Sequence, residues 1–344
     1  MHMRAFRTKS VFVLLCVAAC LAFPGSLWSQ AVLRVAAVQT ESVPGDISAN
    51  LANARTLVEE AAGEGAELIL LPELMPSGYI ISKEIWDGAE PSDGPTITWL
   101  KTVSEELGVW LGTSFVEAEG EDFFNTFVLT DPEGAIAGRV RKQYLASQET
   151  FFMKGDAGLH LIDTSLGKIG VVICFEATLC TMIRQMHTAS VDLMFLPTAD
   201  PVLEFDKDKD PSDWDHDLTE TALLYAERLG VPAVLANQGG AWKTPLPGLL
   251  PDQDSIFRGQ SAIADSDGAL LAFLGQDEGV IVADVILDSS LKVADTPPCL
   301  GRYCKEMPLA SRVYQVVIEA LGKLWYALSI ERREKAREIS SGET

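Results

Sequence analysis

The chain has 344 residues, of which 47% are hydrophobic and 22% are charged, so it contains enough apolar material for a large core. Its formal net charge of −22 at pH 7 argues against nucleic acid and anionic membrane surfaces as partners, because both bind to basic patches. Length alone allows one or two domains.

The first 31 residues have the features of an export signal. Basic residues precede an apolar stretch at 11–23 that is short for a membrane span, Pro24 and Gly25 follow it, and Ser29 and Ala31 are small residues of the kind that signal peptidase reads. We therefore expect residues 1–31 to be a signal peptide and the protein to be exported, to the periplasm or the medium. A lipid anchor on Cys20, in a segment that resembles a bacterial lipobox, and an uncleaved N-terminal anchor are the alternatives.

The rest of the chain alternates strands and helices. Apolar runs and alternating patterns predict strands at 33–39, 68–71, 109–116, 125–130, 135–142, 191–196, 231–237, 261–264, 270–273 and 280–285, with a further strand ending at Cys174. Periodic apolar residues predict helices at 46–63, 96–107, 179–189 and 218–229. This order indicates an α/β layered architecture, and no linker interrupts it. We expect one catalytic domain over 32–290.

Residues 291–344 are predicted to be a C-terminal extension with a packing helix. Residues 313–330 are apolar along one helical face and carry charges on the other, at a spacing that excludes a transmembrane span. The helix is expected to pack on its own domain or on a second subunit, and a membrane-surface helix is the less favoured alternative.

Four cysteines lie outside the predicted signal, too few for a disulfide-stapled scaffold. In an oxidising compartment, Cys299 and Cys304 could close a short loop, so we expect them to pair. Cys180 is expected to be a core residue of the helix that follows Cys174, and Cys174 is expected to remain a free thiol.

Three reactive residue types stand at the ends of predicted strands. Glu73 follows "LILLP", Lys142 follows a strand in "GRVRKQYL", and Cys174 follows three β-branched residues in "GVVICFE". A thiol with a pKa of about 8.5 needs a base to become a nucleophile, and the oxyanion that forms on attack needs positive charge or hydrogen-bond donors. Taken singly, each residue could be structural, and the histidines form no recognisable Cys-His signature.

Together, these motifs resemble the nitrilase (carbon–nitrogen hydrolase) superfamily over roughly residues 32–287. Further matching segments are "FNT" (124–126), "MKGD" (153–156), "LPT" (196–198), "ANQGG" (236–240) and "FRGQSAIADSDG" (257–268). The resemblance implies a four-layer α-β-β-α sandwich with Cys174 as nucleophile, Glu73 as general base and Glu149 as a second glutamate. It also implies that Lys142 and the backbone N–H of Phe175 hold the oxyanion.

The resemblance further implies a small-molecule substrate and no metal or organic cofactor. Asn125 and Thr198, in the "FNT" and "LPT" segments, are expected to contribute to substrate binding. Hydrolysis of a small amide through a cysteine thioester is the favoured reaction, with nitrile hydrolysis as the alternative and a catalytically silent binding protein as a different class. We expect a homo-oligomer.

The acidic segment at 204–217 borders the active-site mouth in the family that the chain resembles. Asp206, Asp208 and Asp210 invite comparison with a calcium loop, but Pro211 stands where such a loop needs glycine. A solvated acidic loop is therefore the interpretation, and it predicts a preference for neutral or cationic amides over anionic ones.

Overall fold

The computed structural model describes residues 31–202, 206–211, 217–245, 252–304 and 309–342. Residues 1–30 of the predicted signal, including Cys20, lie outside the described residues, as do Glu204, Asp213 and Asp215 of the acidic segment.

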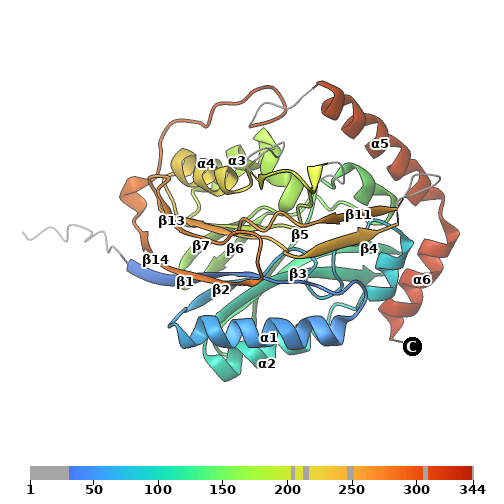
Figure 1. Ribbon diagram of the computed structural model, residues 1–344, viewed down its shortest axis with the longest axis horizontal. Helices are drawn as coiled ribbons and strands as arrows, with labels where there is room; N and C mark the ends of the chain where they lie inside the picture. Colours follow the sequence, from blue (N-terminus) through green and yellow to red (C-terminus); the bar gives the residue numbers. More distant parts are fainter. Residues whose placement is uncertain (1–30, 203–205, 212–216, 246–251, 305–308, 343–344) are drawn as a thin grey trace, which may run out of the picture.

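Two six-stranded sheets form the centre of the molecule (Figure 1). The first has the order β14-β1-β2-β3-β4-β5, and the second has the order β13-β12-β9-β8-β7-β6. The first sheet contains β1 (Ala31–Gln39), β2 (Leu68–Leu70), β3 (Trp110–Glu119), β4 (Asp122–Thr130), β5 (Ile136–Arg141) and β14 (Gly279–Leu287). The second contains β6 (Leu161–Thr164), β7 (Gly167–Val171), β8 (Leu193–Pro197), β9 (Ala233–Ala236), β12 (Ala262–Ala264) and β13 (Leu270–Phe273). β10 (Ala241–Thr244) and β11 (Gln253–Ile256) form a separate hairpin.

The strands next to the reactive residues are parallel to their neighbours. β2 pairs in parallel with β1 and β3, and β7, β8 and β9 are parallel in the other sheet. Strand ends of the same direction therefore gather at one edge of each sheet, which is where ligand sites form in α/β proteins.

Helices cover the outer faces of both sheets. α1 (Ile47–Gly63) and α2 (Pro95–Leu107) pack on the first sheet through a core that includes Leu57, Leu100 and Phe115. α3 (Cys180–Ala189) and α4 (Thr219–Leu229) pack on the second. The inner faces meet in a shared core that includes Phe127 and Phe195. The predicted four-layer α-β-β-α sandwich is confirmed, because each sheet buries apolar residues on both faces.

The C-terminal helices α5 (Leu309–Leu328) and α6 (Ile330–Ser341) lie along one side of the sandwich (Figure 1). α5 packs on the short helix η2 (Ser147–Phe151) through a face with Gln315, Gly322 and Tyr326, which are buried. Gly322 permits this approach, because a Cβ atom there would lie 2.0 Å from Oγ1 of Thr150.

Most of the apolar face of α5 points outward, and Trp325 is the member that packs on the domain, against the rings of Trp86, Phe151 and Phe152. The exposed residues of this face are Val313, Val316, Val317, Leu321, Leu324 and Leu328. Within the described ranges, no helix is long and apolar enough to cross a membrane. α6, which the sequence pattern did not indicate, begins with Ser329 as its N-cap and is fastened to β4 by an ion pair of Arg332 with Asp122.

The disulfide prediction was wrong. Cys299 pairs with Cys180, and Cys304 is a buried thiol. Backbone contacts explain why Cys299 pairs with Cys180. The N–H of Cys180 donates to the carbonyl of Arg302 at 2.9 Å, and Tyr303 forms an antiparallel bridge with Leu179. This contact brings the loop at 299–304 against the start of α3. Cys180 is therefore buried, as expected, but is cross-linked.

Candidate active site

Four of the predicted residues converge between the sheets. Glu73 follows β2 after two residues, Lys142 comes directly after β5, and Cys174 follows β7 after two residues, while Glu149 lies in η2. Lys142 Nζ lies 2.7 Å from Oε1 of Glu73 and 2.9 Å from Oε1 of Glu149. All three charged side chains are fully buried. One buried ammonium thus bridges two buried carboxylates.

Glu73 is held by contacts from three other segments. Asn125 donates from Nδ2 to Oε1 of Glu73 at 2.7 Å. The backbone N–H of Glu73 donates to the carbonyl of Thr198 at 3.3 Å, and Gln238 Nε2 donates to the carbonyl of Glu73 at 2.7 Å. Within the described structure, Oε2 accepts no hydrogen bond from an oxygen or nitrogen donor. That oxygen is therefore available to take a proton.

Burial and neighbouring charges set the pKa values of the site. Burial raises the pKa of Glu73 to about 7, with a further increase from the Glu149 carboxylate and a partial offset from Lys142. Burial alone would lower the pKa of Lys142, but the carboxylates of Glu149 and Glu73 outweigh it, so that pKa lies well above its usual value. The pKa of Cys174 is also well above its usual value, because of burial and then of the Glu73 carboxylate. The resting site therefore pairs a protonated thiol with a carboxyl group that titrates near neutrality.

Cys174 sits at a sharp turn between a strand and a helical turn. Ile173 is extended, whereas Cys174 opens the short helix η3 (Cys174–Thr178) with a φ of 52°. This left-handed conformation is uncommon for a residue with a side chain and is typical of strained functional positions. The turn leaves the Cys174 side chain only half-buried.

Glu176 connects this turn to the segment that carries Lys142. Its Oε2 accepts from the N–H of Ile173 at 3.0 Å, and its Oε1 accepts from the N–H groups of Gln143 at 2.7 Å and Tyr144 at 3.0 Å. His160 Nε2 lies 3.1 Å from both carboxylate oxygens. Glu176 is fully buried, so these hydrogen bonds hold the Lys142 and Cys174 segments together.

Both carboxylate oxygens of Glu149 accept hydrogen bonds, which fix its orientation. Besides the contact with Lys142, Oε1 accepts from the hydroxyl of Tyr79 at 2.9 Å, and Oε2 accepts from the N–H of Ala146 at 2.8 Å. Sequence reasoning missed Tyr79, His160 and the connecting role of Glu176. The "CFE" segment drew attention to Glu176, whereas no local pattern distinguished Tyr79 or His160.

Asn125, Thr198 and Phe175, which were expected to contact substrate, make three different kinds of contact in the structure. Asn125 donates to Glu73, and the hydroxyl of Thr198 donates to the carbonyl of Leu196 at 3.0 Å. These two side chains therefore support the base and the strand end. Phe175 directly follows Cys174 and packs, half-buried, against the core of the second sheet.

The part of the acidic segment that the structure describes is only partly solvated. Asp206 is nearly buried and pairs with Lys209, whereas Asp208 and Asp210 are exposed. Asp200, which precedes this segment, accepts from Nε of the buried Arg258 at 3.0 Å and raises the pKa of Cys174 slightly further.

Comparisons with known proteins agree with this geometry. The chain matches the family described as "Carbon-nitrogen hydrolase" over residues 34–293. An N-carbamoylputrescine amidase of Solanum lycopersicum is 31% identical over 268 residues, which are 75% of this chain and 87% of that protein. A nitrilase of Pyrococcus abyssi is 31% identical over 184 residues, or 50% of this chain and 70% of that protein.

Two solved structures have the same fold. A carbon–nitrogen hydrolase from Helicobacter pylori G27 superposes with a TM-score of 0.68 at 22% identity, covering 76% of this chain and 90% of that one. An amidase from Nesterenkonia sp. gives a TM-score of 0.60 at 23% identity, covering 75% of this chain and 91% of that one. The chain belongs to the carbon–nitrogen hydrolase family of the nitrilase superfamily and is a hydrolase that acts on non-peptide C–N bonds.

Proposed function

We propose that the protein hydrolyses a small amide through a thioester on Cys174. The observation that carries this proposal is the buried network in which Lys142 bridges Glu73 and Glu149, with Glu73 titrating near pH 7 beside the thiol. A base of that pKa can remove a thiol proton and return it to a leaving group at neutral pH.

The proposed reaction has two halves. As Sγ of Cys174 attacks the amide carbonyl, Glu73 takes the thiol proton, and Lys142 Nζ with the N–H of Phe175 stabilises the oxyanion. Glu73 then gives its proton to the departing nitrogen, which leaves as ammonia or an amine and forms the thioester. In the second half, Glu73 takes a proton from water, and the hydroxide attacks the thioester. The carboxylic acid leaves, and Cys174 recovers its proton from Glu73.

The supporting roles follow from the contacts. Glu149 accepts a hydrogen bond from Lys142 and so holds the ammonium in position to stabilise the oxyanion. Tyr79 donates a hydrogen bond to Glu149 and fixes the orientation of that carboxylate. Asn125 directs Glu73 by occupying Oε1, so that Oε2 exchanges protons with the thiol. These residues position the reacting groups and need not touch substrate.

Amides are favoured over nitriles as the substrate class. Among the relatives, N-carbamoylputrescine amidases match more of the chain than the nitrilase of Pyrococcus abyssi does. We further propose that neutral or cationic amides are preferred, because the segment that follows β8, the strand next to β7, carries more carboxylates at 204–217 than its two lysines, Lys207 and Lys209, can balance.

Ammonia release from a panel of neutral, cationic and anionic amides, carbamoyl compounds and nitriles tests this proposal. Turnover of amides by the protein, and none by Cys174→Ala, is the expected result. Release only from nitriles would establish the alternative reaction. Stoichiometric labelling of Cys174 by chloroacetamide without turnover of any compound would favour a silent binding protein.

Comparing kcat/KM for matched cationic and anionic amides at low and high salt tests the charge preference. A cationic preference that weakens with salt is expected, because mobile ions screen exposed charges. Equal values at both salt concentrations would contradict it.

We propose that the protein is exported, on the basis of its first 31 residues. Cleavage after Ala31 would leave β1 intact except for its first residue, which pairs with Leu287 at the end of β14. N-terminal sequencing of the mature protein should begin at Val32. Lipid on Cys20 would establish the anchored alternative, and an intact N-terminus would contradict cleavage.

We also propose that the protein is a homo-oligomer that buries the outward face of α5. This face exposes large apolar side chains along a 20-residue helix, at positions that recur every three or four residues. Light scattering of the purified protein should give at least a dimer, and Val317→Glu with Leu321→Glu should shift it toward the monomer. A monomeric wild-type protein would contradict this proposal.

A further inference from the structure

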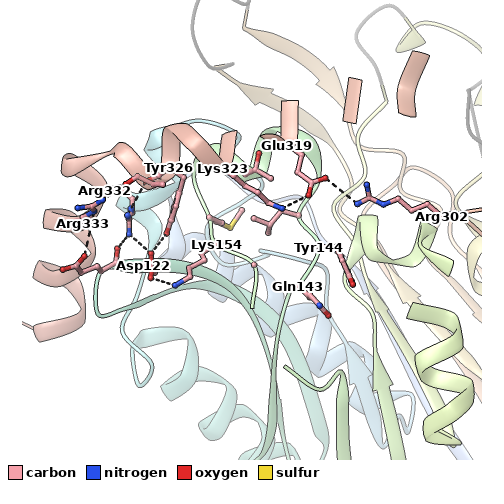
Figure 2. A pocket seen from close by; sticks show the side chains of 16 residues that line it. Asp122, Gln143, Tyr144, Lys154, Arg302, Glu319, Lys323, Tyr326, Arg332 and Arg333 are labelled. Atoms are coloured by element: carbon pink, nitrogen blue, oxygen red, sulfur yellow. Dashed lines mark hydrogen bonds and ion pairs between the residues drawn. The ribbon is translucent and has the colours of Figure 1, made fainter. Parts of the chain in front are cut away.

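A cavity of about 670 Å³ lies beneath α5 and the start of α6 (Figure 2). Its opposite wall is formed by the segment from Gln143 to Gly155. The volume is in the range of small-molecule sites. Glu73, Lys142 and Cys174 do not line it, so it is a separate cavity from the proposed catalytic site.

Cationic side chains outnumber carboxylates around the cavity, whereas acidic residues outnumber basic ones in the whole chain. The chain has 49 acidic residues against 27 basic ones. The cavity wall carries five cationic side chains and three carboxylates. The cationic residues are Lys154, Arg302, Lys323, Arg332 and Arg333, and the carboxylates are Glu121, Asp122 and Glu319.

At one end, each carboxylate is shared by two cations. Asp122 pairs with Lys154 at 2.7 Å and with Arg332 at 2.5 Å. Glu121 pairs with Arg337 and, at 4.0 Å, with Arg333. Two carboxylates cannot neutralise four cations, so positive charge remains at this end.

The other end repeats the arrangement. Glu319 on α5 is shared by Lys323 at 2.7 Å and by Arg302 at 3.5 Å. Figure 2 shows this group and the Asp122 group on two sides of the cavity. The wall also includes the apolar side chains of Leu145, Met153 and Ala327.

We propose that the cavity binds a small, elongated organic dianion, such as a straight-chain dicarboxylate. Its two carboxylates would meet the two cationic ends, where Lys and Arg form charge-assisted hydrogen bonds, and its methylene chain would contact the apolar side chains of the wall. This binding site does not depend on the proposed amide hydrolysis.

The cavity also adjoins the segment that carries Lys142 and Glu149. Gln315 of α5 donates to the carbonyl of Leu145 at 3.3 Å and accepts from the N–H of Ser147 at 3.1 Å. A dianion that joins the 143–155 wall to α5 would stiffen this contact. Because the dianion binds only the folded protein, it should raise the melting temperature progressively as its concentration increases.

Isothermal titration of the full chain with succinate, glutarate, adipate and pimelate at constant ionic strength tests the proposal. One of these is expected to bind one-to-one, at least about tenfold more tightly than butyrate, since the second cationic end would otherwise stay empty. Lys154→Gln and Lys323→Gln should each weaken binding by about five- to tenfold. Both side chains are at least half exposed, so the variants should fold, as their melting without ligand would verify.

Matched controls make the result specific. Lys243→Gln removes an exposed lysine that does not line the cavity and should leave binding unchanged. Alkylating Cys174 with chloroacetamide should also leave binding unchanged. The proposal is overturned by an absence of saturable heat, by equal affinity for butyrate, by an equal loss in Lys243→Gln, or by loss of binding after alkylation, which would place the anion at Cys174.

Discussion

Lys142 and Glu73 form an ion pair with 2.7 Å between Nζ and Oε1, and neither side chain is exposed to solvent. Such a pair is costly to bury, and removing one partner leaves an uncompensated charge. The position of this costly ion pair beside a thiol favours a chemical role for it over a stabilising one.

Replacing Lys142 with Met should lower kcat by at least about a hundredfold, because it removes a charge that stabilises the oxyanion. Since Lys142 lowers the pKa of Glu73, the remaining activity should also shift to higher pH. Steady-state kinetics across pH measure both effects. Lys101→Met on the exposed face of α2 is the control, and a rise in KM with kcat unchanged would show that Lys142 only binds substrate.

The pH dependence follows from Glu73, which must be deprotonated to accept the thiol proton. With its pKa raised to about 7, kcat/KM should increase as pH rises through about 7 and level off above about 8. No loss is expected until well into the alkaline range, because the pKa values of Cys174 and Lys142 are raised well above their usual values. A profile already flat at pH 5 would contradict a base with a raised pKa.

The two cysteines six residues apart should behave differently. Cys174→Ala should abolish turnover and leave the melting temperature nearly unchanged. Cys180→Ala should retain most activity at moderate temperature but lower the free energy of unfolding by about 2–5 kcal/mol, because it removes the bond to Cys299. A dead Cys180 variant beside an active Cys174 variant would reverse the assignment of the nucleophile.

Mass spectrometry of unreduced, alkylated peptides checks the pairing directly. A peptide with Cys180 should be cross-linked to one with Cys299, and Cys304 should appear as a protected thiol that alkylates after unfolding. A cross-link between Cys299 and Cys304 would restore the expectation from sequence spacing.

Gly322→Ala should loosen α5, because the added Cβ would fall on Oγ1 of Thr150. A loss of about 1–3 kcal/mol in unfolding free energy is expected for such overpacking. Faster amide hydrogen exchange in α5 and η2 would locate the effect. Ala320→Ser on the exposed side of the helix is the control, and equal stability of the two variants would show that α5 does not depend on this close contact.

Much of the fold could be predicted because hydrophobic periodicity is a local property. The runs before Glu73 and Cys174 read as buried strands, and both residues lie just past strand ends in the structure. Helices α1 to α4 also begin and end within a few residues of their predicted limits. α6 was missed, because its charged sequence has no apolar stripe and contacts with other parts of the chain hold it in place.

For α5, the sequence identified the apolar face but not the face that packs. A helix with one apolar face is expected to bury it, yet Gly322 and Gln315 face the domain, and most of the apolar face points outward. Backbone approach at Gly322 and hydrogen bonds to Leu145 and Ser147 decided the orientation. Periodicity records which residues share a face, not what that face meets.

By itself, the sequence determined the layered fold and, through the resemblance of its motifs, the family, and it predicted the set of Glu73, Lys142 and Cys174. Only the tertiary structure decided that Tyr79 fixes Glu149 and that Gln238 holds Glu73, contacts that span 70 and 165 residues along the chain. It likewise decided that Cys180, 119 residues away, and not Cys304, pairs with Cys299. Such contacts depend on how the two sheets stack and on where their strand ends meet. No local sequence pattern encodes contacts between residues so far apart in the chain.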